Sequence, residues 1–173
     1  MKYQDCAGAA QAAAGESSGA APGGHLAAAN INPATGLATD YLNHFNEAIM
    51  LLEMLSSSPD CLDDFLGWRP MTYREHFAAS HFKGRDMAIA AYEAADPNLR
   101  DCLDALAGTM TAVLEAARAA MRSDMPVDAT VMLAERAAAW LRPLVARAGA
   151  LINGDEAGHR IVPQAVVDGL MKR

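Results

Sequence analysis

Residues 97–122 read PNLRDCLDALAGTMTAVLEAARAAMR, and this stretch decides the fold class. Its apolar residues recur every three or four positions, which is the period of a helix that buries one face. The apolar stripe consists of Leu99, Leu103, Leu106, Met110, Val113, Ala117 and Met121. Four charged residues fall outside the stripe and are expected to face solvent: Asp101, Asp104, Glu115 and Arg118.

The same period predicts three further long helices, over residues 36–56, 72–95 and 127–152, and a short helix over 59–66. The helix over 72–95 has a sequence-level start, because Thr72 opens a T-x-x-E capping box. The helix over 127–152 is expected to bury a stripe made of Leu133, Ala137, Trp140, Leu144, Ala148 and Leu151.

Composition also favours an all-α fold. The chain has 38 alanines against 4 Phe, 4 Tyr and 2 Trp, and alanine is the best helix former whereas aromatic residues favour strands. Four helices joined by turns predict an up-down-up-down four-helix bundle over residues 31–154. Residues 1–30, rich in Ala, Gly and Ser, are expected to form a disordered N-terminal arm. Residues 155–173 would form a short C-terminal tail, with a short helix at 163–172 as one option.

Charge and cysteine content exclude several classes of function. A net charge of −7 argues against a partner made of nucleic acid and against an anionic membrane surface. No apolar run approaches the ~18 residues of a membrane span. The three cysteines lie far apart without C-x-x-C spacing, which fits reduced thiols better than a disulfide framework. We therefore expect a cytoplasmic protein.

One segment inside the predicted second long helix breaks the apolar pattern: residues 80–86 read SHFKGRD. At 100° per residue, His81 and Arg85 fall on the apolar arc, so both side chains are predicted to point inward. His76 falls outside this arc and is expected to face solvent. A buried guanidinium is costly unless it is paired and hydrogen-bonded, and the first predicted helix offers partners for it. The predicted buried polar cluster consists of His44, Glu47, His81 and Arg85, with Glu53 or Asn46 as a competing partner.

This cluster has a structural and a metal-binding interpretation. As a structural network it would fix the register of two helices, like a polar residue in a coiled-coil seam. As a metal site, His44, Glu47 and His81 would provide three nitrogen and oxygen ligands for zinc or a non-haem iron. The E-x-x-H repeat of carboxylate di-iron bundles is absent from the sequence. No cofactor is predicted apart from this transition-metal alternative.

A third interpretation is phosphotransfer. The letters HFKG at residues 81–84 resemble the H-x-x-K-G signature of bacterial histidine phosphotransfer domains, which are also four-helix bundles. The resemblance implies that His81 would carry the phosphoryl group, with the Lys and Gly beside it holding and accommodating that group. Lys83 and Gly84 each come one residue early, which rotates them by 100° on a helix and places the lysine elsewhere. A phosphoaccepting histidine must be exposed, whereas the helical wheel places His81 inward.

No recognisable catalytic set is present: the sequence has no G-x-S-x-G, no phosphate loop, no Rossmann glycine run and no H-E-x-x-H. The leading interpretation is therefore a non-enzymatic regulatory or interaction protein with a protein partner, or one that self-associates through an alanine-rich face. The chain ends in VVDGLMKR, which resembles the short C-terminal loading peptides of encapsulin cargo proteins and could dock on a partner. The alternatives are the metal- or cofactor-binding bundle and the phosphotransfer carrier.

Overall fold

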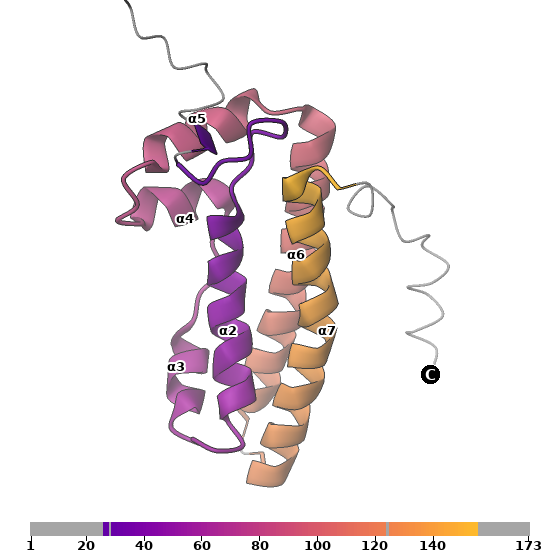
Figure 1. Cartoon of the computed structure of the whole chain (residues 1–173). Coiled ribbons are helices and arrows are strands. Elements are labelled where there is room, and N and C mark those ends of the chain that lie inside the picture. The colour runs from indigo at the N-terminus through magenta and orange to yellow at the C-terminus, as the bar shows by residue number, and fades with distance from the viewer. Residues whose placement is uncertain (1–25, 28, 124, 156–173) are drawn as a thin grey trace, which may run out of the picture.

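The computed structural model describes residues 26–27, 29–123 and 125–155, and this part of the chain is helical (Figure 1). Its elements are the 3₁₀ helix η1 Thr39–Tyr41, then α2 Leu42–Met54, α3 Cys61–Gly67, α4 Tyr73–Ala79, α5 Arg85–Ala94, α6 Pro97–Met121 and α7 Val127–Asn153. The only extended pairing among the described residues is a single antiparallel bridge between Ile31 and Ala38. The all-α prediction is confirmed.

Three long helices, α2, α6 and α7, run side by side and form the body of the molecule, with α7 packed against both of the others (Figure 1). The short helix α3 packs against α2 and also contacts α6. Helices α4 and α5 lie across one end of the body (Figure 1). The up-down-up-down four-helix topology is not confirmed, because the segment predicted as the second long helix forms two short helices, α4 and α5, and the body in the described part of the chain has three long helices.

The predicted helix over 72–95 is two helices, α4 and α5, separated by residues 80–84. The Ser80 hydroxyl donates to the carbonyl of Phe77 at 2.9 Å and accepts from the Phe82 amide at 3.4 Å, and such local side-chain bonds compete with a continuing helix. Gly84 then permits close packing, because a Cβ there would stand 2.8 Å from the Phe82 ring and 2.9 Å from Ala29. The inward rotation predicted for His81 and Arg85 was wrong, since it assumed an unbroken helix.

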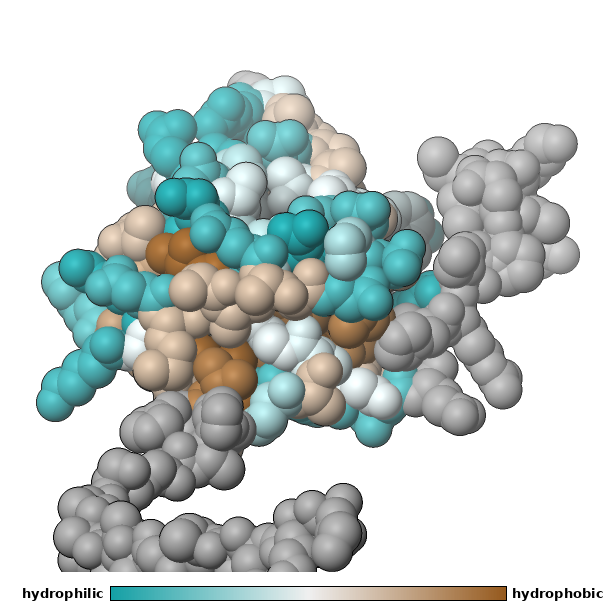
Figure 2. Space-filling model, turned by 90° about the horizontal axis from the view of Figure 1, so that it is seen from above, coloured by the Kyte–Doolittle hydropathy of each residue, from teal (hydrophilic) through white to brown (hydrophobic). Residues whose placement is uncertain are grey.

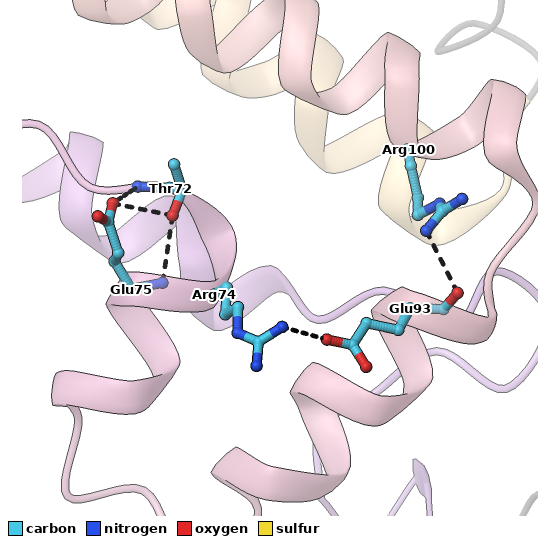
Figure 3. Close-up of polar contacts among 5 residues, drawn as sticks. All are labelled: Thr72, Arg74, Glu75, Glu93 and Arg100. Carbon is cyan, nitrogen blue, oxygen red and sulfur yellow. Dashed lines mark hydrogen bonds and ion pairs between the residues drawn. The ribbon is translucent and has the colours of Figure 1, made fainter.

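Helix ends follow the capping rules. The Thr72 hydroxyl accepts from the Glu75 amide at 3.2 Å, and the Glu75 carboxylate accepts from the Thr72 amide at 2.8 Å (Figure 3). The Asp96 carboxylate accepts from the Asn98 amide at 2.7 Å and starts α6. Helix α7 ends at Gly154, whose φ of 79° lies in the left-handed region that glycine adopts without strain.

Polar contacts join α5 to α4 and to α6. Arg74 of α4 pairs with the Glu93 carboxylate of α5 at 2.6 Å, and Arg100 of α6 donates to the Glu93 carbonyl at 3.2 Å (Figure 3). Both contacts are exposed, so each contributes at most about 1 kcal/mol. Their effect is to fix the direction of α5 relative to its neighbours.

Two predictions about the core need correction. Trp140 was expected in the buried stripe of α7, but its side chain is 61% exposed and the next residue, Leu141, is fully buried instead. The folded region also begins before residue 31, because Leu26 and Ala29 pack against the core. The rest of the predicted arm, residues 1–25 and 28, and residues 156–173 of the predicted tail lie outside the described residues.

None of the helices in the described ranges combines the length and the apolar character needed to cross a membrane.

Candidate functional site: an imidazole pair beside an open depression

His44 lies on α2 among buried aromatic side chains, with only 6% of its surface exposed. Its ring stacks on the indole of Trp68, with centroids 4.7 Å apart and planes inclined by 22°. Trp68 follows α3 directly and folds back so that its indole N–H donates to the His44 carbonyl at 3.2 Å. The Nε2 atom of His44 is buried and has no hydrogen-bond partner among the described residues. A buried polar atom without a partner is uncommon and marks a position worth testing for function.

A second imidazole lies next to the first. His76 of α4 is half-buried, and its ring centroid lies 6.0 Å from that of His44. Burial is the largest cause that lowers the pKa of His44, and the neighbouring His76 lowers it further, while the backbone of Arg69 acts in the opposite direction. Burial also lowers the pKa of His76, while Asp40 acts in the opposite direction. Both rings are therefore held in their neutral form more strongly than a solvated histidine.

Tyrosines anchor the imidazole pair to the rest of the fold. The Tyr41 hydroxyl donates to the Met71 carbonyl at 3.0 Å, and the Tyr73 hydroxyl accepts from the Ala38 amide at 2.9 Å. Burial raises the pKa of Tyr73 to about 12, so the hydroxyl stays protonated at neutral pH. The Tyr73 ring stacks on Tyr92 with centroids 4.4 Å apart. These contacts join η1, α4 and α5 into one aromatic cluster around the imidazoles.

An open depression of about 460 Å³ borders this cluster. Its lining combines His44 and Glu47 of α2 with Asp64, Trp68 and Arg69 from α3 and the segment after it. The lining therefore offers two carboxylates, one guanidinium and an aromatic edge to a small polar ligand. It is open to solvent, which is unlike the enclosed, mostly apolar pockets that bury most of a ligand.

The structure brings together only part of the predicted polar cluster. His44 and Glu47 line the depression, but Glu47 is exposed. Glu53 points to the other side of α2, where its carboxylate accepts from Nε of Arg142 on α7 at 2.7 Å.

His81 and Arg85 do not belong to the cluster, because both are exposed near the break between α4 and α5. The Arg85 guanidinium lies 3.6 Å from Asp86 and 3.5 Å from the Ser80 carbonyl. Each of these contacts is local to the break. The predicted buried pairing of Arg85 with the first helix is therefore corrected.

The metal-binding alternative requires three ligand side chains to lie together. Among residues 26–27, 29–123 and 125–155, no three His, Cys, Asp or Glu side chains are grouped so that they could hold a metal ion. His44 is buried on α2, Glu47 is exposed one turn further along, and His81 is exposed near the break between α4 and α5.

Sequence reasoning missed three residues with unusual environments. His76 was assigned to a solvated face, although Tyr73, His76 and Phe77 share an i, i+3, i+4 spacing that could have placed it inward. Arg118 was also expected to face solvent, yet it is only 8% exposed. Trp140 was expected inside and lies outside. Helical phase alone gave the wrong side for each of these residues.

The largest exposed apolar side chains on a single helix lie on α7. Trp140 is 61% exposed and Met132, two turns earlier, is 70% exposed. At the end of the molecule that carries α5, hydrophobic residues on the surface are separated by hydrophilic ones (Figure 2). We call the outer side of α7 that carries Met132, Arg136 and Trp140 the α7 face.

Comparison of the chain with models of protein families, with curated protein sequences and with solved structures gives no match.

Proposed function

We propose that the chain is a small regulatory or interaction protein that works by binding through the α7 face, with a second copy of itself as the first partner. The observation that carries the proposal is the exposed indole of Trp140. Tryptophan is the residue type most enriched among interface residues that dominate binding energy, because it buries a large area with few torsions to fix.

The chemistry of the α7 face suits a protein surface. Met132, Arg136 and Trp140 follow one another at intervals of four residues, so they lie on one side of the helix. Exposed Ala139 and Pro143 adjoin Trp140 and leave room for a partner helix to approach. Methionine adapts its shape to a partner, which adds contact area at little strain.

Local charge supports self-association over an unrelated partner. The chain carries a net charge of −7, which opposes the approach of two copies. On α7 this repulsion is reduced, because exposed Glu135 and Arg136 balance each other and Arg142 is already paired with Glu53. A twofold pairing of identical faces then places both signs of charge opposite each other.

Sedimentation velocity of the full chain over a hundredfold range of concentration tests the proposal. We expect a monomer–dimer equilibrium, and we expect Trp140→Ala to weaken dimerisation by about tenfold or more, as truncation of a central interface residue does. Met50→Ala, which removes an exposed methionine on α2 instead, is the matched control and should dimerise normally. A wild-type chain that stays monomeric throughout would overturn the proposal.

A second candidate function is favoured by the position of His81. The helical wheel placed this imidazole inward, whereas it is exposed beside exposed Lys83 and Arg85. Exposure is what a phosphoaccepting histidine needs, and two cations nearby suit a phosphoryl group. Incubation with phosphoramidate tests this function: acid-labile phosphate that disappears in His81→Gln would support it, and its absence from the wild type would exclude it.

Two further expectations stay proposals. A metal- or cofactor-binding function would use His44, Glu47 and His81, and elemental analysis of the purified protein checks it. A cytoplasmic location agrees with Cys61 and Cys102, which are both free thiols. Fractionation of cells that produce the chain checks the location.

A further inference from the structure

Arg118 is a buried cation near the C-terminal end of α6. Its Nη2 atom donates to the carbonyl of Leu66, in the last turn of α3, at 3.0 Å. Its Nε atom is buried and has no hydrogen-bond partner in the described part of the chain. A guanidinium has five N–H donors, so capping the α3 carbonyl accounts for only part of its hydrogen-bonding capacity.

Two more arginines stand close to Arg118. Arg122 lies one helical turn further along α6, and Arg69 follows Leu66 by three residues. Burial lowers the pKa of Arg118, and the charges of Arg122 and Arg69 lower it further. Glu115 acts in the opposite direction as the weakest of these influences. No ion pair joins any of the three arginines to a carboxylate within the described ranges.

This concentration of positive charge is unexpected in an acidic chain. Only 14 residues are Lys or Arg against 21 Asp and Glu, so carboxylate partners for arginine are plentiful. Like charges at neighbouring positions repel each other, and burying one of them adds a desolvation cost. A helix cap needs one guanidinium, so the cap explains neither the second nor the third arginine.

We propose that Arg69, Arg118 and Arg122 form a binding site for a phosphate-type oxyanion. Guanidinium groups present paired N–H donors that match the oxygens of phosphate, and a doubly charged tetrahedral anion offsets three cations better than a carboxylate does. The contact with Leu66 fixes the position of Arg118 on the buried side of the site. The exposed Arg69 and Arg122 then contact the anion from the solvent side. Arg69 also lines the depression, which leaves space beside the site for the group that carries the phosphate.

Isothermal titration of the full chain with inorganic phosphate, at pH 7.5 and at an ionic strength held constant with sodium chloride, tests the site. We expect saturable binding of one phosphate per chain. Arg122→Gln and Arg69→Gln, both at exposed positions, should each weaken this binding by about tenfold or more, because each removes a charge-assisted contact. Arg74→Gln, at an exposed position on α4 outside the proposed site, is the matched control and should bind phosphate as the wild type does.

Three results would overturn the proposal: no saturable phosphate binding by the wild type, equal affinity in Arg122→Gln, or acetate binding as tightly as phosphate at the same ionic strength. Circular dichroism of each variant confirms that the helical fold is retained. Arg118→Lys adds a separate measurement, because it keeps the charge and loses the paired donor geometry. It should weaken phosphate binding about as much as the other two variants.

Discussion

The indole of Trp68 covers the imidazole of His44, at a centroid distance of 4.7 Å, and donates a hydrogen bond to the carbonyl of the same residue at 3.2 Å. Two contacts to one residue fix the segment after α3 against the first turn of α2. This segment also carries Arg69, so the same anchor positions the edge of the depression and the proposed oxyanion site. Trp68 therefore links the stability of the fold to the geometry of both sites.

Replacing Trp68 by alanine should lower the free energy of unfolding by about 3–5 kcal/mol, because it leaves a large cavity and removes the indole hydrogen bond. Urea denaturation followed by circular dichroism measures the change. Trp140→Ala is the matched control, since it removes the same side chain from an exposed position and should shift stability by no more than about 0.5 kcal/mol. Both are compared at a concentration low enough to dissociate a dimer. Equal losses of unfolding free energy in the two variants would contradict the burial of Trp68 and the exposure of Trp140.

The imidazole pair predicts a stability that falls in mild acid. The pKa values of His44 and His76 are lowered from the ordinary 6.5, so below that pH the unfolded chain binds protons that the native state resists. Stability is then fully present above about pH 6.5 and is lost progressively as the pH falls toward the native pKa values. Urea midpoints measured between pH 8 and pH 5 should decrease over this window.

Two variants separate the imidazole contribution from general acid sensitivity. His44→Phe keeps a flat ring against Trp68 and removes one titrating group, so the decrease in the urea midpoint between pH 7.5 and pH 5.5 should shrink. Phe45→Leu lowers stability through packing at a neighbouring buried position and should keep the wild-type pH dependence. A His44→Phe protein with an unchanged pH dependence would show that the titration of His44 does not contribute to it.

The helices that could be predicted from sequence are those with a long, regular apolar period and a clear cap. Helix α6 was predicted at 97–122 and spans Pro97–Met121, and the helix predicted at 127–152 is α7, Val127–Asn153. The short helix predicted at 59–66 is α3, Cys61–Gly67, although it has neither feature. A regular apolar spacing over several turns predicts a helix correctly even where one residue is assigned to the wrong side. The break between α4 and α5 was missed because it depends on a local hydroxyl contact at Ser80 and on tertiary packing around Gly84.

The candidate site was harder to predict than the fold. His44 is buried, and its neighbour is His76 instead of His81. The side chain of a second helix that lies next to α2 depends on where that helix is interrupted. When the interruption is not predicted, the expected orientation of every later side chain is wrong. Arg118 was missed because its neighbour is a backbone carbonyl of α3, and a carbonyl acceptor leaves no pattern in the sequence.

The capping box at the start of α4 predicts a measurable loss when its hydroxyl is removed. Thr72→Ala should lower the free energy of unfolding by about 0.5–2 kcal/mol, because the Glu75 amide loses its acceptor. Thr109→Ala is the control: its hydroxyl donates to the Ala105 carbonyl within α6, where a helix loses little without it. If Thr109→Ala proved the more harmful of the two, the cap would not be the source of the stability.

Two glycines should respond in opposite directions to the same substitution. Gly108 lies on the exposed side of α6 with nothing within 4 Å of a new Cβ, so Gly108→Ala should stabilise the protein by about 0.5–1 kcal/mol through helix propensity. Gly84→Ala places a Cβ 2.8 Å from the Phe82 ring and 2.9 Å from Ala29, so it should destabilise by about 1–3 kcal/mol through overpacking. Thermal denaturation of both variants beside the wild type measures the pair. A Gly84→Ala protein that melts higher than the wild type would indicate that the helix prefers to continue through residues 80–84, which would restore the inward positions of His81 and Arg85.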